Sequence, residues 1–298
     1  ANIFLGINQG LCWSTAVMMK IDLAGVKNRG LAMGINEFAG YFSLALIAFL
    51  TGYLASHYGL KPYPFYMGII LSVAGLLGSV FLITDTEKHV QLEASIPENS
   101  KYEEGKKLVK NVFRNTTWQS KNISSVTQAG LINNLNDAMV WGLFPLLLAS
   151  KGFNLAQIGL IVAIYPAVWG ISQLFTGILA DHYRRKTLLF WGMLMQGLVL
   201  LLLPLFTGYY FYVIMSTLLG LGTALVYPTF LAAVADFSHP YQRAHSIGIF
   251  RFWRDSGYVL GALLTGLIID HFNYSTAIFV VAGLTILSAI VIILRMNE

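Results

Sequence analysis

Apolar positions dominate this chain and gather into nine long runs. The runs cover residues 1–20, 29–56, 64–83, 125–149, 155–180, 187–206, 208–235, 245–269 and 275–295. A helix of about 20 apolar residues matches the thickness of a bilayer, whereas a membrane strand needs only about 10 residues. The pattern therefore predicts nine transmembrane helices in an all-α membrane protein. The one long polar stretch, residues 84–124, separates the third run from the fourth.

A repeat lies within this pattern. Asp22, Arg29 and His57 recur 214 residues later as Asp236, Arg243 and His271. Charged residues are scarce in apolar surroundings, so these matches indicate a duplicated unit. The period holds six predicted helices, and two complete units would hold twelve. We therefore expect three helices to be missing at the N-terminus, with the rest of a first unit in 1–83, a cytoplasmic linker in 84–124 and a complete second unit in 125–298.

Composition and charge agree with a membrane protein. The chain is 56% hydrophobic and 11% charged, against about 25% charged in soluble domains. Most Lys and Arg residues fall in alternate loops, which places the linker and the C-terminus in the cytoplasm, beside an anionic inner leaflet. The net charge of +5 thus reflects topology and does not indicate nucleic acid. We expect an integral protein of a prokaryotic inner membrane.

Enzymatic motifs are absent from the sequence. The single Cys12 rules out a disulfide framework and a cysteine metal site. No phosphate-binding glycine loop, HExxH or Gly-x-Ser-x-Gly occurs. We expect no catalytic site, no cofactor and no metal.

The linker carries one helical pattern. Leu108, Val109, Val112 and Phe113 recur at helical spacing, with basic residues opposite. This favours a short helix on the inner membrane surface. The alternative is a solvated tether.

A motif between the fifth and sixth runs identifies a family. Gly177 is followed after three residues by Asp181, and then by Arg184, Arg185 and Lys186. This resembles the signature loop of the major facilitator superfamily, whose hallmarks also include two six-helix repeats and a long inner linker. His182 and Arg184 depart from the usual pattern, which has a basic residue and a glycine there. The resemblance implies a fold of two pseudo-symmetric six-helix bundles, here lacking the first three helices, that moves solutes by alternating access.

The signature loop has a physical interpretation. Gly177 has no side chain, so another helix can approach closely. Asp181 can face the positive N-terminal end of a helix, which the resemblance identifies as the one over 29–56. Arg184, Arg185 and Lys186 would hold the loop at anionic headgroups. We favour a conformational latch over a plain positive-inside anchor.

The repeated Asp22, Arg29, Asp236 and Arg243 form an inner belt. Each Arg begins a helix, where its charge opposes the helix dipole, and the Asp seven residues earlier can offset that cost across the loop. One interpretation is a set of ion pairs that break and re-form as the halves rock. The other is a pair of static surface contacts of little energy.

Ionisable residues inside predicted membrane helices are candidates for function. Asn133, Asp137 and Trp141 share one helix face, and the resemblance places that helix at the central cavity. Asp137 would take up a proton or bind a cationic cargo. The alternative is a structural carboxylate satisfied by Asn134, Asn136 or a neighbouring helix.

Repeat-equivalent positions give further candidates. Gln9 and Trp13 correspond to Thr223 and Tyr227, and these line the cavity or serve packing. Glu37 corresponds to Arg251, which lies one turn from Asp255. The arginines of this cluster would bind an anionic cargo, or else pair structurally with acids on the missing helices; they are Arg251 and Arg254.

These features predict a secondary active transporter for a small solute, proton-coupled and monomeric when complete. The helix over 29–56 contains no proline, which disfavours the drug/proton antiporters of the family. A pH-independent uniporter remains an alternative. So does a non-transporting sensor or scaffold subunit of a membrane complex.

Overall fold

The computed structural model describes residues 2–59, 61–96 and 102–297, and all regular elements within these ranges are helical. Long helical segments occupy each of the nine predicted places, so the all-α prediction is confirmed for this part of the chain. The first segment is continuous through α1 (Asn2–Asn8), the π-helical η1 (Gln9–Trp13) and α2 (Ser14–Ala24). The others are α3 (Arg29–Tyr58), α4 (Tyr63–Leu82), α7 (Lys121–Ser150), α8 (Leu155–His182), α9 (Arg185–Leu202), α10 (Tyr209–Phe237), α11 (Arg243–His271) and α12 (Tyr274–Arg295).

Five of these helices, among the described residues, are long and apolar enough to cross a membrane: α4, α8, α9, α10 and α12. In α7 and α11 the apolar pattern is interrupted by buried polar and charged residues such as Asp137 and Arg254. Candidate functional residues lie at these interruptions.

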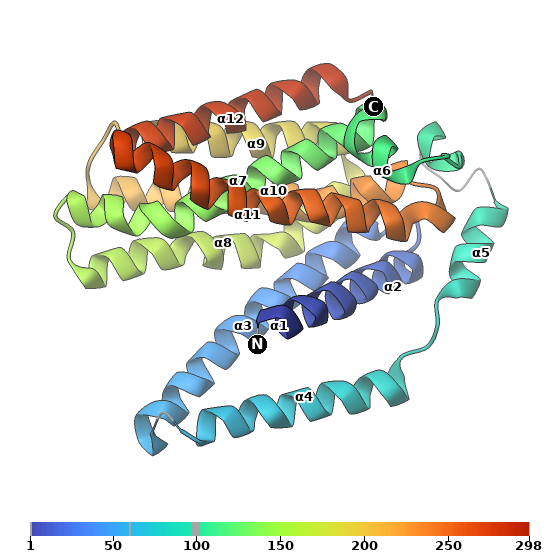
Figure 1. Ribbon diagram of the computed structural model, residues 1–298, viewed down its shortest axis with the longest axis horizontal. Helices are drawn as coiled ribbons and strands as arrows, with labels where there is room; N and C mark the ends of the chain where they lie inside the picture. The colour runs from blue at the N-terminus through green and yellow to red at the C-terminus, as the bar shows by residue number, and fades with distance from the viewer. Residues whose placement is uncertain (1, 60, 97–101, 298) are drawn as a thin grey trace.

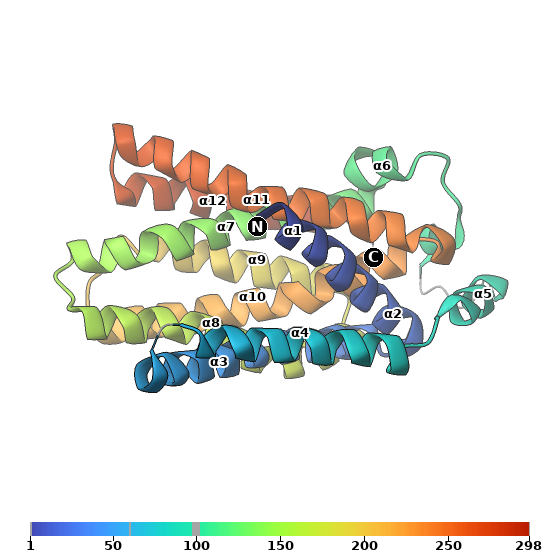
Figure 2. The same ribbon diagram turned by 60° about the horizontal axis from the view of Figure 1, so that its bottom comes forward.

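The helices form two groups (Figure 1). Helices α7 to α12 make one bundle, in which α7 packs on α11, α8 on α10, and α9 on α12. The segments α1 to α4 lie beside it, and α3 makes the main contact by packing against α8 and α10. Figure 2 shows α4 running along the edge of the molecule, where it packs on α3 alone among the stronger contacts.

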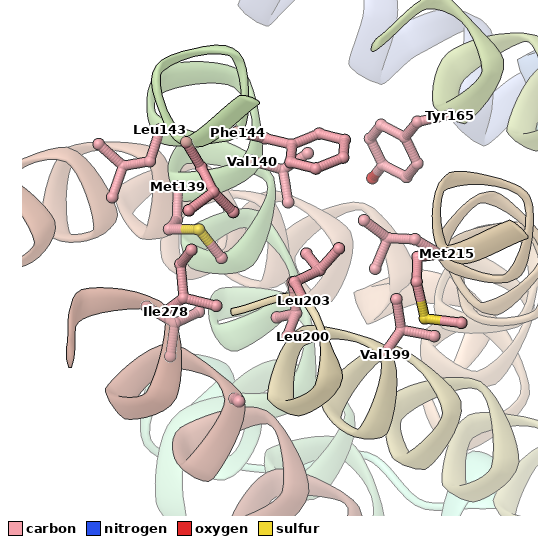
Figure 3. Close-up of a cluster of buried hydrophobic side chains, with 14 of the residues drawn as sticks. Met139, Val140, Leu143, Phe144, Tyr165, Val199, Leu200, Leu203, Met215 and Ile278 are labelled. Carbon is pink, nitrogen blue, oxygen red and sulfur yellow. The ribbon is translucent and has the colours of Figure 1, made fainter. Parts of the chain in front are cut away.

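One apolar core cluster of the bundle lies between α7, α8, α9, α10 and α12 (Figure 3). Phe144 of α7, Leu200 of α9 and Ile278 of α12 are each at most 2% exposed. This close packing fixes α7 against its neighbours, and with it the polar residues that α7 carries.

Glycines let α3 and α8 touch backbone to backbone. A Cβ atom on Gly177 would lie 2.7 Å from the carbonyl oxygen of Gly30 and 3.0 Å from Cα of Gly34. Such small-residue contacts bring membrane helices close together. The contact lies where α3 begins and α8 ends, which we call the linker side. Towards the opposite end of the molecule, α3 and α8 diverge (Figure 1).

The linker differs from the expectation. The surface helix expected over 108–113 is not formed: only Val112–Arg114 (α6) is helical there, followed by the π-helical η4 (Asn115–Gln119). The reason is a competing contact, because Val109 N–H donates to Gln242 Oε1 over 2.9 Å and Gln242 Nε2 donates to the Val109 carbonyl over 2.8 Å. The linker instead contains a helix at α5 (Glu87–Ser95) and a 3₁₀ turn at η3 (Glu103–Lys106). Residues 97–101 of the expected linker lie outside the described residues.

The close approach of α3 and α8 predicts a strong effect of one methyl group. We expect Gly177→Ala to lower the free energy of unfolding by about 1–3 kcal/mol, because the new Cβ must push the two backbones apart. Gly266→Ala in α11 is the matched control, since nothing lies within 4 Å of a Cβ there. Alanine is the better helix former by about 1 kcal/mol, so the control should be neutral or more stable. Thermal unfolding in detergent measures both, and equal effects of the two substitutions would contradict the prediction.

Candidate functional site

Asp181, in the last turn of α8, caps the start of α3. Its Oδ1 accepts a hydrogen bond from Gly30 N–H over 2.6 Å, and its Oδ2 accepts one from Leu31 N–H over 2.8 Å. The first N–H groups of a helix have no partner within the helix and carry its positive dipole end. Gly177, one turn earlier, permits the approach that these short contacts require. The carboxylate of one half thus holds the helix terminus of the other.

The four belt residues form crossed ion pairs. Arg29 Nη1 lies 2.9 Å from Asp236 Oδ1, and Arg243 Nη1 lies 2.8 Å from Asp22 Oδ1. The expected pairing across each residue's own loop is therefore wrong. Each arginine begins a helix that packs against the other half, α3 on α10 and α11 on α2, so the aspartate that it contacts belongs to the other repeat. The surface-pair interpretation is also wrong, because none of the four side chains is more than 10% exposed.

Glu93 of the linker helix α5 joins the two crossed pairs. Its Oε1 lies 2.5 Å from Arg29 Nη2 and 2.6 Å from Arg243 Nη2. Burial by itself would raise the pKa of Glu93, but the two guanidinium groups hold that pKa below its ordinary value. For Asp22 the balance is opposite, since burial raises its pKa despite the contact with Arg243. Sequence reasoning missed Glu93, because a glutamate in a charged linker carries no distinguishing pattern.

The three basic residues of the signature loop lie in different surroundings. Arg185 is 1% exposed; its Nε lies 2.9 Å from Asp236 Oδ2 and its Nη2 lies 3.6 Å from Asp181 Oδ1. Its expected place at lipid headgroups is therefore wrong, because two buried acids hold it inside the protein. Lys186 Nζ donates to the Met296 carbonyl over 2.7 Å, while Arg184 is exposed.

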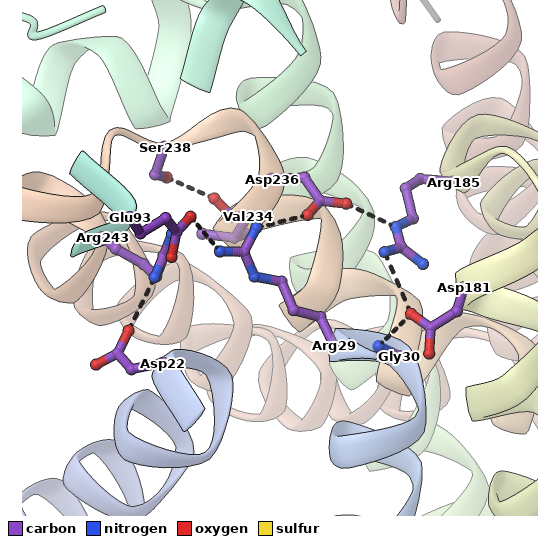
Figure 4. A network of polar contacts seen from close by, with 10 residues as sticks. All are labelled: Asp22, Arg29, Gly30, Glu93, Asp181, Arg185, Val234, Asp236, Ser238 and Arg243. Atoms are coloured by element: carbon purple, nitrogen blue, oxygen red, sulfur yellow. Dashed lines mark hydrogen bonds and ion pairs between the residues drawn. The ribbon is translucent and has the colours of Figure 1, made fainter. Parts of the chain in front are cut away.

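Seven side chains thus form one continuous structure, which we call the linker-side charge network (Figure 4). It runs in the order Asp22, Arg243, Glu93, Arg29, Asp236, Arg185 and Asp181. It joins both halves and the linker at one end of the molecule. Four acids face three arginines, and the N-terminus of α3 supplies further positive potential beside Asp181.

A second polar group surrounds Asp137 in the middle of the α7–α12 bundle. The Asp137 side chain is fully buried; Tyr165 OH donates to its Oδ1 over 2.5 Å and Asn133 Nδ2 donates to its Oδ2 over 3.4 Å. Thr223 Oγ1 lies 3.2 Å from Tyr165 OH. Trp141, the third residue of the predicted stripe, is 45% exposed and its ring centroid lies 6.0 Å from that of Tyr165. The partner of Asp137 on the neighbouring helix is therefore Tyr165, and Thr223 belongs to the same group.

Aromatic side chains connect this group to the contact between the halves. Trp169 of α8 is 1% exposed, and its ring centroid lies 5.8 Å from Tyr165, 4.8 Å from Tyr227 and 4.3 Å from Tyr41 of α3. Tyr41 and Trp169 thus meet across the halves. Sequence reasoning missed both, because aromatic residues are frequent in apolar helices. The available signal was the spacing of Tyr165 and Trp169, one turn apart.

The charged cluster of α11 gathers residues from both halves. Asp255 accepts hydrogen bonds from Arg251 Nε over 3.0 Å and from Arg254 Nε over 2.9 Å. The guanidinium carbons of Arg251 and Arg254 lie 4.3 and 5.0 Å from the ring centroid of Trp13, and Arg254 lies 5.6 Å from that of Tyr227. Guanidinium groups over aromatic faces are attracted by the ring quadrupole. The predicted candidates Trp13, Tyr227 and the two arginines are therefore neighbours.

A hollow of about 550 Å³ borders this cluster. It is lined by residues of the first helical segment and of α11, including Gln9, Ser14, Arg251 and Asp255. Arg251 Nη1 donates to the Gln9 carbonyl over 2.9 Å and to Ser14 Oγ over 3.1 Å. Gln9 therefore contributes its backbone to the cluster.

Glu37, on α3, accepts a hydrogen bond from Asn36 Nδ2 over 2.9 Å and is 8% exposed.

Comparison with known proteins gives consistent matches. The sequence model of the Major Facilitator Superfamily matches residues 1–125 and 126–298. The Inner membrane transport protein YnfM of Escherichia coli is 27% identical over 50% of this chain and 36% of its own length. The Uncharacterized MFS-type transporter YddS of Bacillus subtilis is 24% identical over 71% of this chain and 48% of its own length. The Hexuronate transporter of Bacillus subtilis is 28% identical over 47% of this chain and 32% of its own length.

The matches therefore span about half the length of these relatives or less. The family model nevertheless covers both halves of the chain, on either side of the boundary where the linker meets the α7–α12 bundle. Together with the all-helical fold, these matches show that this integral membrane protein belongs to the major facilitator superfamily.

Proposed function

We propose that the protein is a secondary active transporter that moves a small solute by alternating access and is driven by a proton gradient. The observation that carries the proposal is the linker-side charge network. It joins the halves by crossed ion pairs at one end of the molecule, while α3 and α8 diverge towards the other end. We interpret this arrangement as a transporter whose halves are held closed on the linker side.

The network supplies the latch of this cycle. Opening the linker side separates Arg29 from Asp236 and Arg243 from Asp22, and removes Asp181 from the start of α3. Breaking a buried ion pair costs about 3–5 kcal/mol when one charge stays unpaired. Entry of water into the opening cleft lowers that cost, so the pairs separate together with the halves. With the linker side placed in the cytoplasm, the closed state faces outward.

The middle of the molecule supplies the binding groups. Asp137, held by Tyr165 and Asn133, is the carboxylate that takes up the coupling proton. Arg251 and Arg254 are the groups for an anionic part of the cargo, and Glu37 is the opposing acid on α3. The contact of Tyr41 with Trp169 lies between these groups and joins the halves. The hexuronate transporter, whose named cargo is an acid, sets a first solute class to test.

Uptake into proteoliposomes tests the function. We expect solute flux from a panel of sugar acids and other small anions, and faster flux when a pH gradient is imposed. Asp137→Asn should abolish the effect of the pH gradient. Flux that ignores pH in the wild-type protein would indicate a uniporter. No flux for any solute would favour a sensor or scaffold.

A double-mutant cycle tests the crossed pairing. We expect Asp22→Asn and Arg243→Gln to be coupled by about 1–3 kcal/mol in the free energy of unfolding, because the two side chains are in direct contact. The cycle of Asp22→Asn with Arg29→Gln is the matched control, since those two residues flank the same loop but do not pair. A larger coupling in the control cycle would show that the pairs form within each loop.

Glu93 gives a prediction about pH. Because its pKa is lowered in the folded protein, its contribution to stability is present above the ordinary pKa of glutamate, about 4.3, and is lost as the pH falls through the lower folded value. We expect Glu93→Gln to lower the unfolding temperature at pH 7, and the difference from wild type to shrink below about pH 4. Glu87→Gln, in the same helix α5 but exposed, should change little. A Glu93→Gln effect that is absent at pH 7 would contradict the bridging role.

A further inference from the structure

Three oxygen-bearing side chains of α7 are buried inside the α7–α12 bundle. Asn133 lies one turn from both Asn136 and Asp137, while Asn136 bonds to α9 and Asp137 bonds to α8. Each is at most 1% exposed. Side chains of α8, α9 and α10 enclose them, namely Tyr165, Gln196 and Thr223. All of these residues belong to the second half of the chain.

The amides of this group leave oxygens unpartnered. Asn133 turns its Nδ2 to Asp137, and the reverse orientation would place two acceptor oxygens against each other. Its Oδ1 is buried and, within the described part of the chain, has no hydrogen-bond partner. Asn136 pairs with Gln196 over 2.9 Å, and whichever way that pair is oriented, one amide oxygen remains free. Buried oxygens of this kind require a donor or a cation.

Of the ion pairs formed by the described residues, none includes Asp137. The charged and titratable groups that face it are Tyr165 of α8, Tyr227 of α10, Arg254 and Tyr258 of α11, and Tyr41 of α3. Arg254 is engaged by Asp255 over 2.8 and 2.9 Å. A carboxylate buried in this way must carry a proton or bind a positive ion.

Carboxylate and amide oxygens are hard ligands that suit alkali and alkaline-earth cations. The site offers a single carboxylate, and no group of three or more His, Cys, Asp or Glu residues occurs among the described residues. One negative charge with neutral oxygens matches a monovalent ion. We propose that Asp137 and Asn133, beside the hydroxyl group of Tyr165, bind a small monovalent cation of the Na⁺ class, in competition with a proton.

The cation site is connected to the contact between the halves. Tyr165 touches Asp137 through its hydroxyl group and packs with Trp169 through its ring, and Trp169 contacts Tyr41 of α3. A cation bound at Asp137 therefore acts on the hydroxyl that orients this aromatic chain. The inference rests on the proposed transport function and deepens it: the coupling ion at one carboxylate is H⁺ or Na⁺.

Thermal unfolding of the purified protein in detergent tests the site. At pH 8 and constant ionic strength, replacing choline chloride by 100 mM NaCl should raise the unfolding temperature by about 5 °C, with a smaller shift for KCl. The Na⁺ concentration that gives half the shift should increase as the pH is lowered to 6, because the two ions compete for Asp137. Equal unfolding temperatures in Na⁺, K⁺ and choline would overturn the proposal.

Matched variants locate the effect. Asp137→Asn and Asn133→Leu should abolish the Na⁺ shift. Gln173→Met should keep it, because Gln173 is equally buried and has no hydrogen-bond partner among the described residues, but lies on α8, outside the site. If the site variants do not fold, binding of ²²Na⁺ to the wild-type protein decides the question: saturable binding displaced by Li⁺ but not by choline supports the site, and no binding rejects it.

Transport separates the two proposals. Solute flux that responds to a pH gradient but not to Na⁺, from a protein that Na⁺ does not stabilise, would reject the cation site and leave the transport function standing. Stabilisation by Na⁺ without flux of any solute would support the site and reject the function.

Discussion

Buried ion pairing across the two halves is the interaction on which the rest of this structure depends. Inside a membrane protein, a guanidinium and a carboxylate that meet away from water are tightly held, and each is costly to leave alone. Arg29 and Arg243 each begin a long helix, so the positions of α3 and α11 follow from where their arginines find acids. The glycine contact of α3 with α8 and the capping of α3 by Asp181 lie at the same end. Helix packing in the middle of the molecule is arranged around this fixed end.

The polar groups at mid-depth follow a different principle. Hydrogen bonds, aromatic contacts and the short-range ion pairs of Asp255 hold them, and among the described residues no linked series of charges joins the halves there as on the linker side. Asp137 has a tyrosine and an asparagine as partners, and Arg254 lies between Trp13, Tyr227 and Asp255. In the proposed transport cycle, such partners allow a change of protonation or of bound ion at Asp137, while the linker side holds the halves together.

Helix positions and the duplicated charges could be predicted from the sequence, because hydrophobic periodicity and scarce charged residues are local signals. The contact partners of these charged residues could not be predicted from the sequence. Asp22 and Arg29 are neighbours in the chain, yet the packing of α2 on α11 gives Asp22 to Arg243. The sequence predicts that Arg185 lies at lipid headgroups, whereas in the structure Asp181 and Asp236 enclose it. Glu93 and Trp169 needed the tertiary structure, since a linker acid and a membrane tryptophan are each common. The expected helix over 108–113 failed because Gln242 competes for the backbone of Val109.

The crossed pairs have a meaning in terms of symmetry. In both contacts, Arg29 with Asp236 and Arg243 with Asp22, the arginine of one copy of the repeat meets the aspartate of the other copy. That is the pattern of an isologous interface, the kind formed by two identical subunits about a twofold axis. Two separate copies of one repeat would make the same two contacts. Glu93 breaks this equivalence, because the linker occurs once and its single carboxylate serves both arginines. The interface otherwise resembles that of a dimer. The linker adds one charge to it, the carboxylate of Glu93, which belongs to neither copy.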